Sequence, residues 1–285
     1  MATWQSGDVH VNGLRLHYTR TGGAKPPVVL AHGFSDDGLC WTPAAEVLEP
    51  DYDVIMIDAR GHGRSDAPEQ GYTMADMAGD LRGVIAALGL RRPAVVGHSM
   101  GGGTTLALAG LYPDVPGAIL LEDAAPLGLA AMRVPHDPDR HVRIVERIAR
   151  FQSMSREQLI AHQRAATPAW SEDVLGLWAD AQLRLSPKAV DFDPTTAVDW
   201  PVALRRVTCP ALLIAADPAR GGMISAESAA VFQSFVPQLR VITIAGAGHC
   251  VRYEQFGRYM DIVRGFLAGV TAEIQRLGAA LRAMA

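Results

Sequence analysis

One stretch, residues 94–105, constrains this chain more than any other. A short apolar run ends in Gly-x-Ser-x-Gly at Gly97, Ser99 and Gly101, and small residues follow. The pattern predicts a buried strand, a tight turn and a helix, with no room for a Cβ at either glycine. Such a turn lifts the Ser99 hydroxyl into a cleft, and the N-terminal N–H groups of the helix point at the same spot. Ser99 is therefore the candidate nucleophile.

Other apolar runs predict the sheet around this turn. The runs at 28–31, 52–57 and 118–121 show no alternation, which is typical of strands buried on both faces of a parallel sheet. Helical patterns separate them, so right-handed crossovers are expected, with the functional residues at the carboxyl ends of the strands. Asn12-Gly13 predicts an antiparallel hairpin at the start of the chain.

Three further motifs accompany the serine turn. Residues 32–33 read His-Gly after a buried strand, residues 58–65 read D-x-R-G-x-G-x-S, and residues 246–249 read G-x-G-H after the last strand. Together with Gly-x-Ser-x-Gly, these motifs resemble the α/β-hydrolase superfamily, and the chain is identified as a serine esterase or lactonase-like member. The resemblance implies a mostly parallel central sheet flanked by helices, with an inserted helical lid. It gives the 58–65 turn a structural role, so His62 is not assigned to catalysis.

The resemblance also implies the roles of the site residues. Ser99 is the expected nucleophile and His249 the expected base. The acid is expected at Asp217, after the penultimate strand. The alternative is Glu122, which stands beside Asp123 at the end of the preceding strand.

The oxyanion hole is expected from two backbone N–H groups. The resemblance places them on Phe34, after the His-Gly turn, and on Met100, after the nucleophile.

The lid segment is expected at residues 124–201, with residues 1–123 and 202–285 forming the core. This segment is rich in basic side chains: Arg133, Arg140, Arg143, Arg147, Arg150, His136, His141 and His162. They could contact a carboxylate or another polar group of a substrate. The alternative, a solvated helix face with arginine stems lying on apolar surface, is the default for a run of charge.

Composition limits the partners and the location. The net charge of −4 gives no reason to expect nucleic acid, and no signal peptide or membrane span is seen. The three cysteines, Cys40, Cys209 and Cys250, form no C-x-x-C pair. We therefore expect free thiols, a cytoplasmic location, no membrane partner and no metal or cofactor.

The expected activity is hydrolysis of a carboxylic ester or lactone of a small, largely apolar substrate through an acyl-enzyme. Alternatives within the same fold are a serine-dependent C–C bond hydrolase, an amidase, a perhydrolase and a non-catalytic small-molecule receptor.

The residue pattern of the C-terminal segment predicts a helix that continues beyond Gly269. Val270, Ile274, Leu277 and Leu281 recur at helical spacing and form an apolar stripe that must be covered. The stripe could pack on its own domain, or it could pair with a second copy in a homodimer.

Overall fold

A computed structural model describes residues 4–127 and 139–283, with side chains as far as residue 273 and that of Arg276. Eight strands within these residues form one sheet in the order β1-β2-β4-β3-β5-β6-β7-β8. Their bounds are β1 Gln5–Val11, β2 Leu14–Arg20, β3 Pro27–Ala31, β4 Asp53–Ile57, β5 Ala94–His98, β6 Ala118–Glu122, β7 Ala211–Ala215 and β8 Leu239–Thr243. The hairpin β1-β2 and the pair β2-β4 are antiparallel, and all the other pairs are parallel. The predicted fold class is confirmed.

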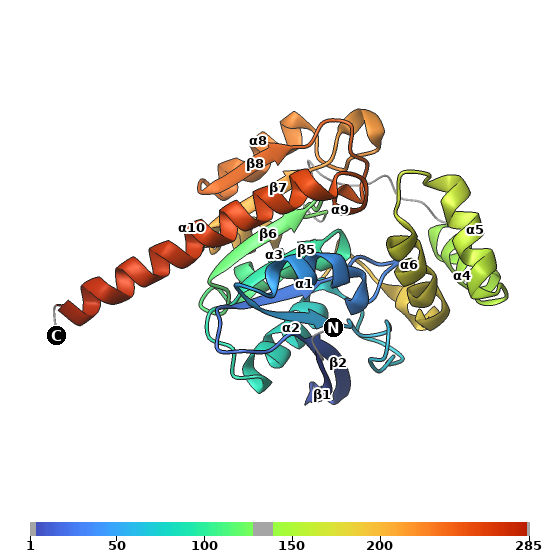
Figure 1. Cartoon of the computed structure of the whole chain (residues 1–285), viewed down its shortest axis with the longest axis horizontal. Helices are drawn as coiled ribbons and strands as arrows, with labels where there is room; N and C mark the ends of the chain where they lie inside the picture. The colour runs from blue at the N-terminus through green and yellow to red at the C-terminus, as the bar shows by residue number, and fades with distance from the viewer. Residues whose placement is uncertain (1–3, 128–138, 284–285) are drawn as a thin grey trace.

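Helices cover both faces of this sheet (Figure 1). Val29 of β3 packs into a core with α2 (Met74–Ala87), α3 (Met100–Leu111) and α8 (Ala226–Phe235). Val28 and Leu30, on the opposite face, pack with α1 (Thr42–Leu48) and α10 (Phe256–Ala283). Because successive strand side chains point to opposite faces, a strand covered on both sides is apolar throughout. This explains the absence of alternation in the central strands.

The described chain between β6 and β7 is mostly helical. Its helices are α4 (Arg140–Gln152), α5 (Arg156–Ala166), α6 (Glu172–Arg184), the 3-10 helix η3 (Pro187–Asp191) and α7 (Trp200–Arg205). Helices α4, α5 and α6 share a small core around Phe151, Leu159 and Trp178, and they lie together at one end of the molecule (Figure 1). Arg133 and His136 of the expected lid segment lie outside the described residues. That this segment acts as a lid stays a prediction.

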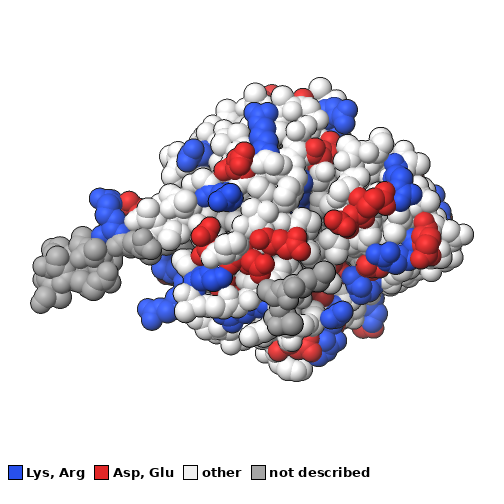
Figure 2. Space-filling model, viewed as in Figure 1, with Lys and Arg blue, Asp and Glu red and all other residues white. Residues whose placement is uncertain are grey.

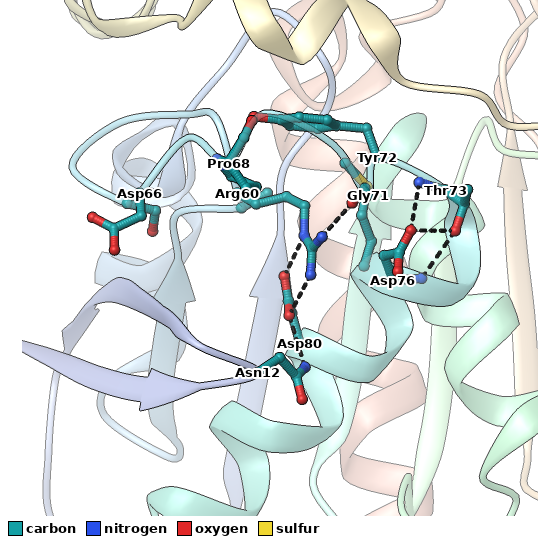
Figure 3. A network of polar contacts seen from close by, with 12 residues as sticks. Asn12, Arg60, Asp66, Pro68, Gly71, Tyr72, Thr73, Asp76 and Asp80 are labelled. Carbon is teal, nitrogen blue, oxygen red and sulfur yellow. Dashed lines mark hydrogen bonds and ion pairs between the residues drawn. The ribbon is translucent and has the colours of Figure 1, made fainter.

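The 58–65 turn contains a buried charge, that of Arg60. Arg60 donates to both carboxylate oxygens of Asp80 on α2, at 2.6 and 2.7 Å, and Asn12 of the β1-β2 turn donates to Asp80 at 2.9 Å (Figure 3). Gly61 and Gly63 take positive φ angles of +76° and +53°. These contacts fasten the turn to α2 and to the N-terminal hairpin, which is a structural role.

The C-terminal helix α10 contains 28 residues and runs well past the edge of the sheet (Figure 1). Its helical continuation beyond Gly269 is as expected. Among the described side chains of α10, Val270 is the last that belongs to the core of that face. The side chains of Ile274, Leu277 and Leu281 lie outside the described residues.

Acidic and basic side chains are interspersed on the face shown in Figure 2. Within the described residues, no helix combines the length and apolarity needed to cross a bilayer. The cytoplasmic location and the absence of a nucleic-acid partner stay predictions.

Candidate active site

Ser99 occupies the turn between β5 and α3 with a strained backbone, at φ +51° and ψ −115°. The two flanking glycines make this conformation sterically accessible. A Cβ on Gly97 would lie 2.3 Å from the carbonyl oxygen of Gly101, and a Cβ on Gly101 would lie 2.2 Å from the carbonyl oxygen of Ala31. Any larger residue would push α3 away from β3 or β5. The motif therefore fixes where the serine hydroxyl lies.

Ser99, His249 and Asp123 form one hydrogen-bonded series. Nε2 of His249 lies 3.0 Å from Oγ of Ser99, and Nδ1 of His249 lies 2.7 Å from Oδ2 of Asp123. With a neutral imidazole, this arrangement places a proton on Nδ1 and leaves Nε2 free to accept the serine proton. These are distances at which a base activates a nucleophile.

Asp123 is held rigidly in this position. Its side chain is fully buried, and its backbone takes φ +40° directly after β6. Its carboxylate also accepts hydrogen bonds from the N–H groups of Ala216, at 3.1 Å, and Met223, at 3.0 Å. Both donors come from the segment after β7, so this segment orients the carboxylate that contacts His249.

The pairing of His249 with Asp217 is wrong. The Asp217 carboxylate accepts hydrogen bonds from the N–H groups of Gly246, at 2.8 Å, and Ala219, at 2.9 Å. These bonds lower the pKa of Asp217, the one from Gly246 most. Asp217 therefore caps the short η4 helix (Pro218–Arg220) and ties it to the loop before His249.

The alternative acid, Glu122, is also wrong as the partner of His249. Its buried carboxylate accepts from the backbone N–H of Arg252 at 2.9 Å and from Nη1 of the same residue at 3.0 Å. Arg252 also donates to Asp36 at 3.0 Å, and its guanidinium lies 4.2 Å from the ring of Trp41. Arg252 lies in α9 (Val251–Glu254), just after His249. The ion pair therefore anchors the loop that contains His249 to β6.

Sequence reasoning did not identify Arg252, and it placed Asp123 only as a neighbour of Glu122. The signal for Asp123 lies in strand register. His98 pairs with Glu122 across β5 and β6, so the residues that follow each of them, Ser99 and Asp123, leave the sheet side by side.

The expected oxyanion donors flank the serine. Met100 is the first residue of α3, where the N–H has no acceptor inside the helix. Phe34 follows β3, and within the described residues its N–H donates to no backbone carbonyl. Nε2 of buried His62 lies 2.9 Å from the carbonyl oxygen of Phe34, and Nδ1 lies 2.9 Å from that of Arg60. Burial lowers the pKa of His62 to about 4, and a neutral ring donates to one of these two carbonyl oxygens. His62 thus steadies the loop as a neutral ring, and the oxyanion role of the two N–H groups stays a prediction.

A cavity of about 480 Å³ opens over the site. Ser99 and His249 line this cavity, and so do Arg140, Arg147 and Trp178 from the helices between β6 and β7. Among the described side chains, no group of three His, Cys, Asp or Glu is placed to hold a metal ion.

Comparison with known proteins agrees with this architecture. The family model described as alpha/beta hydrolase fold matches residues 26–255. N-formylmaleamate deformylase of Pseudomonas putida is 29% identical over 266 residues, which are 92% of this chain and 96% of that protein. 2-(Acetamidomethylene)succinate hydrolase of Mesorhizobium japonicum is 25% identical over 242 residues, covering 81% of this chain and 84% of that protein.

A solved structure is similar over the same range. The enol-lactonase from Burkholderia xenovorans superposes with a TM-score of 0.72 at 25% identity, covering 92% of this chain and all of that one. The fold, the serine turn and the matched family model agree over most of the chain. This chain belongs to the α/β-hydrolase fold family and is an enzyme of that fold.

Proposed function

We propose that this protein is a serine hydrolase that cleaves a carboxylic ester or lactone through an acyl-enzyme. The observation that carries the proposal is the continuous series from Ser99 Oγ to His249 at 3.0 Å and from His249 to Asp123 at 2.7 Å. This geometry is the one that nucleophilic acyl transfer requires.

In the proposed reaction, Oγ of Ser99 attacks the substrate carbonyl carbon as Nε2 of His249 takes the hydroxyl proton. Asp123 accepts the Nδ1–H and stabilises the positive imidazolium that forms. The N–H groups of Phe34 and Met100 bind the oxyanion of the tetrahedral intermediate. When the C–O bond breaks, His249 returns its proton to the leaving oxygen.

Water completes the proposed cycle. It attacks the acyl carbon while His249 takes its proton. His249 then gives this proton to Oγ of Ser99 as the bond between Oγ and the acyl carbon breaks, which releases the acid product and restores Ser99. Water is the one co-reactant, so this chemistry needs no cofactor or metal. The cavity of about 480 Å³ fits a small substrate.

Amide hydrolysis is the second candidate, and a specific observation favours it. Two relatives that match over most of their length are named for N-acyl compounds, N-formylmaleamate and 2-(acetamidomethylene)succinate. The same groups would act, with His249 giving its proton to a leaving nitrogen in place of an oxygen. The enol-lactonase likeness supports the first candidate.

A substrate panel with one variant tests the proposal. The wild-type protein is expected to hydrolyse p-nitrophenyl esters or simple lactones, and a folded Ser99→Ala variant is expected to lose this activity. An N-acyl panel measured alongside distinguishes the amidase. Binding without turnover of any ester, lactone or amide would indicate a small-molecule receptor, and full activity of Ser99→Ala would overturn the proposal.

The cytoplasmic location is also a proposal. It is supported by Cys40, Cys209 and Cys250, which are all free thiols in the structure, as expected in a reducing compartment.

A further inference from the structure

Helix α4 presents two arginines to the cavity that contains Ser99. Arg140 and Arg147 both line this cavity. They are two helical turns apart, so they share one face of α4 and are separated by about 10 Å along its axis. Asp36 is the one carboxylate among the described lining residues, and Arg252 and Tyr253 already occupy its oxygens.

Arg147 has an unusual environment for an arginine. Its Nε is buried and has no hydrogen-bond partner among the described residues. Burial lowers the pKa of Arg147, and the positive charges of Arg140 and Arg150 lower it further. A partly buried guanidinium without a counter-charge is costly, because the charge loses water without gaining a partner.

Among the described residues, three other arginines of the helices between β6 and β7 form ion pairs, which Arg147 does not. Arg156 pairs with Asp180 at 2.7 Å, Arg164 with Glu172 at 2.6 Å and Arg184 with Asp37 at 2.6 Å. Ion pairing accounts for these three side chains. It does not account for Arg147, which faces the cavity.

Arg140 adds to the positive charge at this wall. Its described hydrogen bond is a long one, from Nη1 to the carbonyl oxygen of Phe192 at 3.5 Å. The guanidinium therefore has donors to spare, and the two cations repel each other until an anion enters.

We propose that Arg147, with Arg140 beside it, binds a carboxylate of the substrate, so that the enzyme acts on small anionic acyl compounds. Arg147 lines the cavity, and its planar guanidinium offers parallel N–H donors that match the two oxygens of a carboxylate. Phe151 and Trp178, which also line the cavity, contact the apolar part of the molecule. This inference rests on the proposed function, and it replaces the expectation of a largely apolar substrate.

Matched ester pairs test the inference. p-Nitrophenyl hexanoate and mono-p-nitrophenyl adipate differ by a carboxylate on the acyl side, and phenyl acetate and m-acetoxybenzoate differ by one on the leaving group. We expect the wild-type enzyme to prefer the anionic member of at least one pair. Arg147→Gln should lower kcat/KM for that ester roughly tenfold to a hundredfold, chiefly through KM, with the neutral ester changed less than about twofold.

Arg150→Gln is the matched control. It removes the same charge from the same helix, but Arg150 is exposed and lies against the Phe151 ring at 5.0 Å without lining the cavity. We expect this variant to keep the preference for the anionic ester. Thermal unfolding of both variants shows whether a loss reflects binding or folding.

A binding measurement separates this inference from the proposed function. Calorimetry on Ser99→Ala should detect adipate but not adipamide, and the added Arg147→Gln substitution should abolish the adipate signal. Equal losses on neutral and anionic esters, or no selective binding of adipate over adipamide, would overturn the carboxylate site while leaving the Ser99 chemistry standing. Retained turnover in Ser99→Ala would overturn the proposed function, whatever adipate does.

Discussion

Asp123 and His249 are 126 residues apart in the sequence, yet Oδ2 of the first lies 2.7 Å from Nδ1 of the second. The contact joins the end of β6 to the loop after β8, across β7, which lies between these two strands in the sheet. The N–H groups of Ala216 and Met223 in the segment after β7 donate to Asp123 on the way. The loop after β7 thus orients Asp123, although Asp123 itself follows β6.

Substitutions of Asp123 and Asp217 should have different effects on activity. Asp123→Asn removes the negative charge that accepts the Nδ1–H of His249, and we expect kcat to fall roughly 10³-fold or more. Asp217→Asn is the matched control, because it changes a cap of η4 that makes no contact with His249, and it should retain activity within a few-fold. Ester turnover by both folded variants is the measurement. A larger loss in Asp217→Asn than in Asp123→Asn would contradict the assignment.

Glu122 should matter for stability more than for chemistry. Glu122→Gln weakens the buried ion pair with Arg252, and we expect the free energy of unfolding to fall by about 3 kcal/mol or more. Glu273→Gln is the control, since its pair with Arg276 on α10 is exposed and screened by solvent, so this variant should leave the free energy of unfolding nearly unchanged. Urea unfolding gives both values. A folded Glu122→Gln protein as inactive as Asp123→Asn would argue that Glu122 has a catalytic role.

The central sheet and the serine turn could be predicted because their signals are local. A run such as 28–31 is apolar on both faces, and Gly97 and Gly101 are required by contacts within one strand-to-helix unit. The choice of acid is not local. Glu122 and Asp123 are adjacent carboxylates at one strand end, and Glu122 pairs with Arg252, 130 residues away, whereas Asp123 faces His249.

The roles of the arginines that line the cavity could not be predicted from the sequence, for the same reason. The sequence shows many arginines between residues 133 and 150, but pairing decides their roles, and pairing depends on the packing of α4 against its neighbours. Arg156 and Arg147 both lie in the helices between β6 and β7, yet Arg156 pairs with Asp180 whereas Arg147 lines the cavity. No sequence periodicity distinguishes these two outcomes.

The buried histidine His62 should make stability depend on pH. Burial lowers its pKa to about 4 in the folded protein, whereas the unfolded chain binds this proton near pH 6.5. Between these values the unfolded state holds more protons, so the free energy of unfolding falls as the pH falls, by about 3 kcal/mol for His62 alone. His62→Gln should reduce proton uptake on unfolding at pH 5 by about one proton. Unchanged uptake in this variant would contradict the burial argument.

Gly101→Ala should damage the serine turn. Its Cβ would lie 2.2 Å from the carbonyl oxygen of Ala31, so α3 must shift, and we expect a loss of about 2 kcal/mol or more in the free energy of unfolding together with reduced turnover. Gly265→Ala in α10 is the matched control, because a Cβ there meets nothing within 4 Å. That substitution should stabilise the helix by up to about 1 kcal/mol. Equal effects at the two positions would show that close packing does not explain the glycine.

The C-terminal end of α10 should mediate self-association. The helix continues past Val270, the last of its described side chains in the core, and extends away from the sheet (Figure 1). In the sequence, this extension has an apolar stripe. Because the helix runs away from the sheet, packing of the stripe on the same domain is a poor explanation. We therefore expect the stripe to be covered by a second copy of the chain in a homodimer. Deleting residues 271–285 should convert a dimer to a monomer in light scattering and leave ester turnover largely intact, since Ser99 and His249 lie in the retained core. Glu273→Gln in the full chain, which leaves the stripe in place, should remain dimeric. A full-length chain that is monomeric, or a truncated chain that stays dimeric, would rule out this helix as the interface.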